Sequence, residues 1–328
     1  MMVHKHVRLV ERDEDGIDRS FRADVLAGMA QSQKAVPARW FYDDAGSQLF
    51  EEITQLPEYY PTRAEREILE TRGGEFAELI GPGRAVVEFG SGSSVKTPLL
   101  LNAISPAAYV PLDISGEFLR ASAAELAGQF PGLPVHAVEA DFMKVVHLPE
   151  EVAGLPMLGF FPGSTIGNLV ARTAVDLLRS MRETLGADTM LLIGMDLIKD
   201  EAALAAAYDD AQGITAQFNL NLVHRINREL DGTIPVDRLR HEARWNDDYA
   251  RIEMHLVASE DIAFHISGQP FAMKAMESIH TENSHKFDRR SQNMLLLAGG
   301  WTPLKRWTDS ERRFSMILAE ATRPRGAP

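Results

Sequence analysis

The chain contains no cysteine. This absence excludes disulfides, thiolate metal sites and cysteine nucleophiles. It fits a reducing compartment, and the first sixteen residues, MMVHKHVRLVERDEDG, lack the apolar segment of a secretory signal. We therefore expect a cytoplasmic protein.

The sequence also lacks long apolar runs and an excess of basic residues. No uninterrupted apolar run reaches the length of about 18 residues that a membrane-spanning helix needs. Lysine and arginine number 34 against 47 aspartates and glutamates, a formal net charge of −13. Such a surface repels phosphate backbones and anionic lipid headgroups. We expect neither a nucleic acid nor a membrane as partner, but a small-molecule substrate and a monomeric protein.

Apolar segments alternate with helical patterns in the middle of the chain. The segments predicted to be strands are RAVVEF, AAYVPLD, VHAVEADF, MLGFFP and TMLLIGMD. This alternation implies right-handed crossovers and an α/β fold with a doubly wound, mostly parallel, Rossmann-like sheet. From Phe287 the pattern is a helix followed by a hairpin, which predicts that the sheet ends with one antiparallel edge strand.

The length of 328 residues suggests two domains. The strand–helix alternation stops at Lys199, and antiparallel-type strand patterns follow until about residue 285. We expect 62–198 and 286–328 to form the sheet domain, and 1–61 and 199–285 to form an α+β lobe over its ligand crevice. Thr62 followed by Glu65 predicts a capping box at the start of a helix that reaches about Ile80.

The first predicted strand runs into a glycine turn, VVEFGSGSSVKT. Backbone amides at such a turn suit an anionic group, and glycine lets a ligand approach closely. Val95 stands where the dinucleotide-binding fingerprint has its third glycine, which weakens the case for a nicotinamide cofactor. Taken alone, a turn with only Gly90 and Gly92 is equally compatible with a purely structural role.

Acidic residues follow the next two strands. Asp113 ends the second strand, at roughly the spacing after Gly90 at which an acid binds a ribose. Asp141 and Phe142 end the third, where an acid could accept from an adenine amino group and a ring could stack on the base. Glu88, inside the first strand, could bind an ammonium group or accept from a loop amide.

These residues together resemble the class I S-adenosylmethionine-dependent methyltransferases. The resemblance implies S-adenosylmethionine as methyl donor and S-adenosylhomocysteine as product. We expect no metal, and the scattered histidines, His280 and His285 included, show no metal-ligand spacing with an acid. The implied cofactor-binding residues are Glu88, Gly90, Ser91 and Gly92 near the methionine part, Asp113 at the ribose, and Asp141 and Phe142 at the adenine. Lys96 would reach the cofactor carboxylate, although a surface lysine fits its position equally well.

Six further motifs carry a narrower resemblance. They are RWFYDDAGSQLFEEIT, LPEYYPTRAE, FFPGSTIGN, AYDDAQGITAQFN, RIEM and TENSHKF. Together they resemble the L-histidine Nα-methyltransferases of ergothioneine biosynthesis, from about Val36 to Ala319. The resemblance implies methylation of the α-amino group of L-histidine, three times, to the trimethylated betaine hercynine.

The same resemblance implies a substrate site. Tyr42, Tyr59 and Asn168 would act at the substrate amine, with Gly163 in the loop of Asn168 and Tyr208 at the carboxylate. Phe50, Thr215 and Met254 would line the pocket, and Glu282 and Ser284 would hold the imidazole. The sequence departs from the pattern at Pro162, where an apolar residue is expected; proline there alters the loop backbone and its available amide.

Simpler structural roles exist for several of these residues. Tyr59 could pack in an extended turn, Tyr208 and Met254 could be core residues, and Asn168 could cap a helix. Glu282 and Ser284 share a face if they lie on a strand, but a solvated loop is the default.

Two other functions remain open. One is a related methyltransferase for another amino acid such as tryptophan or tyrosine, which the carboxylate of Glu282 disfavours. The other is a nucleotide-binding module without catalysis, which the intact Asp113, Asp141 and Asn168 disfavour.

Overall fold

The computed structural model describes residues 17–92, 96–114 and 116–322. The predictions for the first sixteen residues and for Val95 therefore lie outside the described residues. The described chain divides into two compact units. Among the described residues, unit 1 comprises 61–198 and 286–322, and unit 2 comprises 17–60 and 199–285. The cofactor and substrate roles expected for the two domains stay predictions.

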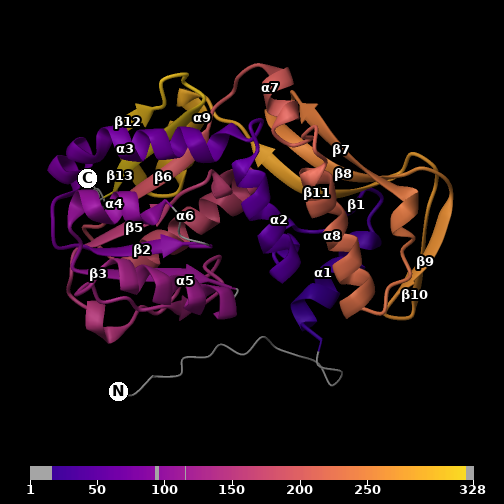
Figure 1. The fold of residues 1–328 in the computed structure, drawn as a ribbon, viewed down its shortest axis with the longest axis horizontal. Coiled ribbons are helices and arrows are strands. Elements are labelled where there is room, and N and C mark those ends of the chain that lie inside the picture. Colours follow the sequence, from indigo (N-terminus) through magenta and orange to yellow (C-terminus); the bar gives the residue numbers. More distant parts are fainter. Residues whose placement is uncertain (1–16, 93–95, 115, 323–328) are drawn as a thin grey trace, which may run out of the picture. The chain divides into compact units, whose positions relative to one another are not determined.

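Unit 1 contains a seven-stranded sheet in the order β12-β13-β6-β5-β2-β3-β4 (Figure 1). Its strands are β2 (Ala85–Phe89), β3 (Ala108–Asp113), β4 (Val138–Glu139), β5 (Met157–Phe161), β6 (Met190–Asp196), β12 (Trp301–Thr308) and β13 (Phe314–Ala321). The pairings from β4 to β6 are parallel, and β13 is antiparallel to both of its neighbours. The mixed, mostly parallel α/β sheet is thus confirmed.

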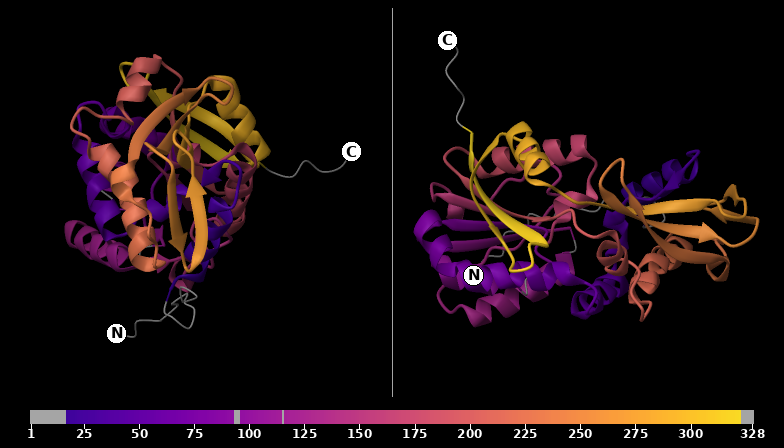
Figure 2. Two further views of the ribbon diagram at one scale, coloured as in Figure 1. Left: turned by 90° about the vertical axis from the view of Figure 1, so that its right-hand side faces the viewer. Right: turned by 90° about the horizontal axis from the view of Figure 1, so that it is seen from above.

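Two details of the predicted sheet are wrong. The antiparallel strand β13 is not at the edge, because β12 pairs with it on the outside (Figure 2). The predicted third strand, VHAVEADF, is reduced to the two residues of β4 and one isolated bridge between Val135 and Tyr109. β4 has a partner on one side only, so its backbone has fewer ladder bonds to keep it regular.

Helices cover both faces of this sheet. They are α3 (Tyr60–Ile80), α4 (Thr97–Ile104), α5 (Gly116–Gln129), α6 (Ala171–Leu185) and α9 (Arg289–Ala298). Val86 packs in a cluster with Phe76 of α3, whereas its neighbour Val87 packs in another with Leu177 of α6. All five residues of β2 are buried, which explains why the strands read as continuous apolar runs.

The start of α3 contradicts the predicted capping box. The helix begins at Tyr60, so Thr62 lies inside its first turn. Pro61 is tolerated there because the first helical amides have no intrahelical acceptor. Glu65 is fully buried in unit 1 instead of reaching back to the helix start.

Unit 2 combines two small sheets with helices. The four-stranded sheet has the order β1-β11-β8-β7, with β1 (Lys34–Ala35), β7 (Leu239–Asn246), β8 (Arg251–Ala258) and β11 (Ser278–His285). A separate hairpin joins β9 (Ile262–Ile266) and β10 (Gln269–Met273), and the main helices are α1 (Arg19–Met29), α2 (Asp44–Gln55), α7 (Glu201–Ala206) and α8 (Ile214–Glu229).

Helix α8 packs along one face of the four-stranded sheet (Figure 2). Phe218 and Leu222 of α8 share a buried cluster with Met254 and Leu256 of β8. We call this the inner face of the sheet and the opposite one the outer face. Among the described helices of the whole chain, none has the length and apolar character needed to cross a membrane.

A buried ion pair joins the two points of unit 1 between which the segment 199–285 of unit 2 is inserted. Asp196 ends β6 and Lys286 follows β11, and Lys286 Nζ lies 2.8 Å from Asp196 Oδ2. The two side chains are 1% and 0% exposed. The N–H of Phe287 donates to the carbonyl of Asp196, and that of Ile198 donates to the carbonyl of Phe287. The chain therefore leaves unit 1 and returns to it at one point.

We predict that Lys286→Ala lowers the free energy of unfolding by about 3–5 kcal/mol, because it leaves a buried carboxylate without its counter-charge. Urea denaturation measures this. The double variant Asp196→Asn/Lys286→Met removes both charges and should lose less than the single variant. A single-variant loss below about 1 kcal/mol would show that the ion pair does not hold this junction.

Candidate active site

The glycine turn after β2, at Gly90–Gly92, is hydrogen-bonded to the end of β3. Gly90 has φ +72°, and a Cβ atom there would lie 3.3 Å from the ring of Phe142. The amides of Gly90 and Ser91 donate to the carbonyl of Leu112 at 2.9 and 3.1 Å, and the amide of Gly92 donates to Asp113 Oδ2 at 3.1 Å. These three amides are therefore already used within the protein, contrary to the expectation that they offer donors to an anionic group.

The predicted ribose and adenine residues lie around this turn. Asp113 contacts it through Gly92. The half-buried ring of Phe142 lies against Gly90 and packs edge-on to Phe89, with ring centroids 6.4 Å apart. Asp141 accepts from the amide of Met143 at 3.1 Å, which orients its carboxylate. The carboxyl ends of β2, β3 and β4 thus bring the glycine turn together with Asp113 and Phe142.

Glu88 is 2% exposed, beneath the turn. The hydroxyls of Thr97 and Tyr109 donate to its Oε2 atom at 2.7 and 2.5 Å. Burial, only partly offset by these two donors, raises the pKa of Glu88 to about 7. The carboxyl therefore titrates well above the range of an exposed glutamate.

The contacts of Glu65 in this region were not predicted from the sequence. Its buried carboxylate forms an ion pair with Lys96, and both of its oxygens accept from the amide of Gly163 at 3.0 Å. Lys96, expected at a cofactor carboxylate, is thus held by Glu65, and the Gly163 amide is occupied. The LPEYYPTRAE motif contains Glu65, but the capping-box interpretation gave it another role.

Asn168 ends the short 3₁₀ helix η3 (Thr165–Asn168) in the loop after β5. The residue that caps the following helix α6 is Val170, not Asn168. The alternative role of helix cap is therefore wrong, and the half-buried Asn168 side chain stays a candidate for ligand contact.

In unit 2, four predicted aromatic residues form a row. The ring centroids of Tyr42 and Phe50 lie 5.6 Å apart, those of Phe50 and Tyr59 6.2 Å, and those of Tyr59 and Tyr208 6.3 Å. At its end the Tyr208 hydroxyl lies 2.6 Å from Ser284 Oγ. Tyr59 and Tyr208 are less than a tenth exposed, so both pack in the core, and their contact with a ligand stays a prediction.

Strand β11 decides between the two alternatives for Glu282 and Ser284. Both residues lie on this strand, opposite Met254 and Ile252 of β8. Since paired residues of neighbouring strands share a face and Met254 and Ile252 belong to the buried cluster, Glu282 and Ser284 lie on the inner face. The solvated-loop alternative is wrong. Thr215, in the first turn of α8, is buried, and its amide donates to Asp210.

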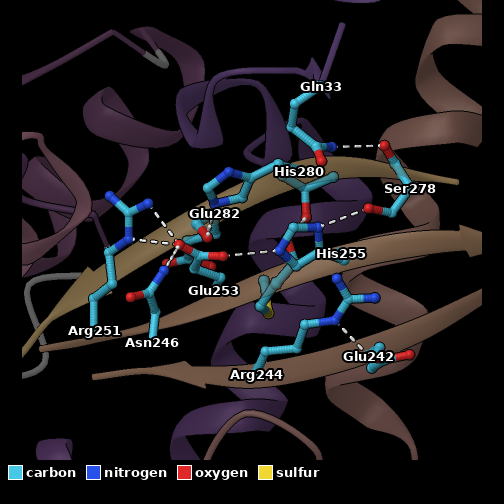
Figure 3. A network of polar contacts seen from close by, with 12 residues as sticks. Gln33, Glu242, Arg244, Asn246, Arg251, Glu253, His255, Ser278, His280 and Glu282 are labelled. Atoms are coloured by element: carbon cyan, nitrogen blue, oxygen red, sulfur yellow. Dashed lines mark hydrogen bonds and ion pairs between the residues drawn. The ribbon is translucent and has the colours of Figure 1, made fainter. Parts of the chain in front are cut away.

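The outer face carries a polar network (Figure 3). Glu253, His255 and His280 have ligand atoms within 4.8 Å of one another, close enough for one metal ion. Sequence spacing missed this group because His280 comes from the strand opposite. Glu253 accepts from Arg251 at 2.8 Å and from His255 at 3.1 Å. A cation would have to displace these partners.

The sequence matches the model of a family described as histidine-specific methyltransferase, SAM-dependent, over residues 21–321. The chain belongs to this family. The resemblance found in the motifs is thereby confirmed.

Known proteins similar to this histidine-specific methyltransferase agree with that assignment. The histidine N-alpha-methyltransferase of Mycobacterium tuberculosis is 40% identical over 312 residues, which cover 93% of this chain and 96% of that protein. The ergothioneine biosynthesis protein 1 of Neurospora crassa is 28% identical over 88% of this chain and 33% of its own length. The solved structure of the CcbJ methyltransferase from Streptomyces caelestis is similar in fold alone, with a TM-score of 0.50, 16% identity, and coverage of 86% of this chain and all of that one.

The outer-face histidines generate a prediction about acid stability. Burial lowers the pKa of His255 to about 4, against the opposing effect of Glu253. Between pH 6.5 and 4 the unfolded chain binds a proton there that the folded chain does not, so stability falls as the pH falls. The loss from this group is on the order of 3 kcal/mol.

Urea denaturation of the wild type and His255→Gln across this range measures the effect. The variant should lose less stability between pH 6.5 and 4.5. The slope of its unfolding free energy against pH should be smaller than that of the wild type by the equivalent of about one bound proton. The difference between the two chains at pH 8, where the ring is neutral in both states, serves as the reference. Parallel loss in both chains would contradict the prediction.

Proposed function

We propose that this methyltransferase transfers three methyl groups from S-adenosylmethionine to the α-amino group of L-histidine. The product would be the trimethylated betaine hercynine, in ergothioneine biosynthesis. Family membership supports the cofactor and the amino acid, and the name of the Neurospora crassa relative supports the pathway. In the structure, the observation that carries the choice of histidine is the pair Glu282 and Ser284 on the face that also holds the aromatic row.

The proposed cofactor residues lie in unit 1. Asp113 would accept from the ribose hydroxyls, Asp141 from the adenine amino group, and Phe142 would stack on the base. Gly90, Ser91 and Gly92 would lie along the methionine part through close backbone approach rather than through their amides. The cofactor, when bound, supplies a sulfonium methyl group; a cationic ammonium near Glu88 would favour the ionised form of that carboxyl.

The proposed substrate residues of unit 2 divide by chemistry. Glu282 would accept from an imidazole N–H, and Ser284 would bond the other ring nitrogen. Tyr208 would donate to the substrate carboxylate. Phe50, Thr215 and Met254 would line the space around the ring. In unit 1, Asn168 would orient the amine; the carbonyl rather than the occupied amide of Gly163 would face that group.

Methyl transfer requires the amine lone pair, and a free α-amine is mostly protonated at neutral pH. Tyr42 and Tyr59 carry hydroxyls able to orient the amine after the proton leaves to water. The trimethylated product has no N–H left, so after the third transfer N–H donation cannot hold it in the site. The faces of tyrosine rings still attract such a cation, which suits the row of Tyr42, Phe50, Tyr59 and Tyr208.

The experiment that tests the function is mass spectrometry of amino acids after incubation with S-adenosylmethionine. A gain of three methyl groups on the α-amine of histidine is the expected result. Methylation of tryptophan or tyrosine with none on histidine would favour the related methyltransferase. Calorimetric binding of S-adenosylhomocysteine with no amino acid bound or methylated would favour the non-catalytic module.

We predict that Glu282→Ala weakens histidine binding by about 10- to 100-fold, because it removes a charge-assisted hydrogen bond to the imidazole. Calorimetry with S-adenosylhomocysteine present measures it. Affinity for S-adenosylhomocysteine itself should stay within about twofold, since Glu282 is not among the proposed cofactor-binding residues. An equal loss of both affinities would mean that Glu282 has a structural role only.

We predict that Tyr42→Phe and Tyr59→Phe each lower kcat, by about five- to tenfold for the loss of one hydrogen bond to the amine. Both variants keep the aromatic row. The fold should therefore be unchanged, and the product should still be trimethylated. Stopped-time assays at saturating histidine measure kcat. Unchanged turnover in both variants would remove the two tyrosines from the catalytic group.

A further inference from the structure

Strand β11 contains a β-bulge at Thr281. His280 pairs with His255 of β8, and the next pairing is Glu282 with Met254, which leaves Thr281 as an extra residue. A bulge of this kind lets two successive residues of one strand stand opposite a single residue of the other. Side chains beyond it therefore change face relative to an unbroken strand.

The change of face decides where the proposed imidazole residues lie. Before the bulge, Ile279 is on the inner face and His280 on the outer face. Strict alternation from there would place Glu282 and Ser284 outward, on the side of His280 (Figure 3). With the bulge they lie inward, opposite Met254 and Ile252. The histidine-recognising pair exists on this face only because of one extra residue.

The bulge is held from the inner face by a directed chain of hydrogen bonds. The Thr281 hydroxyl donates to Asn219 Oδ1 at 2.7 Å and also lies 3.1 Å from the carbonyl of Met254. Asn219 Nδ2 is 2.8 Å from His241 Nδ1, and His241 Nε2 is 2.8 Å from the carbonyl of Tyr208.

The donors in this chain can be assigned. Asn219 Oδ1 accepts from Thr281, so its nitrogen must donate to His241 Nδ1, and the His241 proton lies on Nε2 and donates to Tyr208. Burial lowers the pKa of His241, in keeping with a neutral ring. The hydroxyl of Tyr208 in turn forms a hydrogen bond with Ser284. The hydrogen bonds thus lead from Thr281 back to a second residue of the same strand, next to the proposed site.

These hydrogen-bonded polar side chains lie in apolar surroundings. Asn219 and Thr281 are 0% and 1% exposed, within the apolar cluster that α8 forms with the sheet. Buried polar groups cost free energy unless bonded, and apolar residues of similar size would pack there without that requirement. On the outer face the bulge is held a second time, because His280 Nε2 lies 2.9 Å from the carbonyl of Glu282 (Figure 3).

We propose that the bulge at Thr281 is the specificity-determining element of the histidine site, with Thr281 and Asn219 as its positioning residues. The proposal rests on the proposed function, in which Glu282 and Ser284 bind the imidazole. Neither Thr281 nor Asn219 needs to touch the substrate. They act by keeping Glu282 and Ser284 on the inner face and Tyr208 beside them.

The test is Thr281→Val, which keeps the shape of the side chain and removes the hydroxyl. Calorimetry with S-adenosylhomocysteine present should show histidine binding weakened by about tenfold or more. KM for histidine should rise more than kcat falls, and affinity for S-adenosylhomocysteine should stay within about twofold. Thr281→Ser restores the hydroxyl and should recover binding to within about threefold.

A double-variant cycle separates positioning from general destabilisation. If Thr281 acts by positioning Glu282, the loss of histidine affinity in Thr281→Val/Glu282→Ala should be smaller than the sum of the losses in the two single variants. Additive losses in the double variant would overturn the proposal. The matched control is Thr233→Val, which removes an exposed hydroxyl that accepts from the amide of His265 in the same unit and should leave histidine binding unchanged.

A third variant covers the case in which Thr281→Val does not fold. His280→Phe keeps a ring to stack on His255 and removes the bond to the Glu282 carbonyl. It should weaken histidine binding, and unchanged binding would overturn the proposal. Failure of the wild type to bind histidine at all would overturn the proposed function, and the bulge proposal with it.

Discussion

The ion pair of Asp196 and Lys286 is the constraint on which the two-unit chain depends. It joins the residue at the end of β6 to the residue that follows β11, with both charges out of water. The segment between them supplies most strands of unit 2, and closing so long a loop costs entropy that local contacts must offset. With its ends held at one point, this segment pairs with the early part of the chain, where β1 lies parallel to β11.

The proposed ligand residues are placed by a few buried polar groups rather than by apolar packing alone. In unit 1, Glu65 joins α3, the start of α4 and the loop after β5 through Lys96 and Gly163. In unit 2, Asn219 joins α8 to β11 and β7. Each carries several directed hydrogen bonds, and such bonds restrict geometry more tightly than dispersion contacts do. Both units therefore use a buried polar residue to hold loops or strands that apolar contacts would leave less restricted.

Much of unit 1 could be predicted because its signals are local. Continuous apolar runs such as the one at Val86 and Val87 arise from burial on both faces, and Gly90 stands where positive φ is required. Some of the motif residues lie together in the structure: the ring of Phe142 lies against Gly90, and the hydroxyl of Tyr208 lies beside that of Ser284. The capping box at Thr62 failed because a local rule was applied to Glu65, whose partners are distant in sequence.

The sequence by itself determined the fold class, the family and the identity of the candidate residues, since these depend on periodicity and on residue types in local motifs. Only the tertiary structure decided which way those residues point. The bulge at Thr281 leaves no mark in the alternation of TENSHKF, yet it turns Glu282 and Ser284 to the inner face. Register between strands is set by partners on β8 and α8, far along the chain, so no local pattern could reveal it.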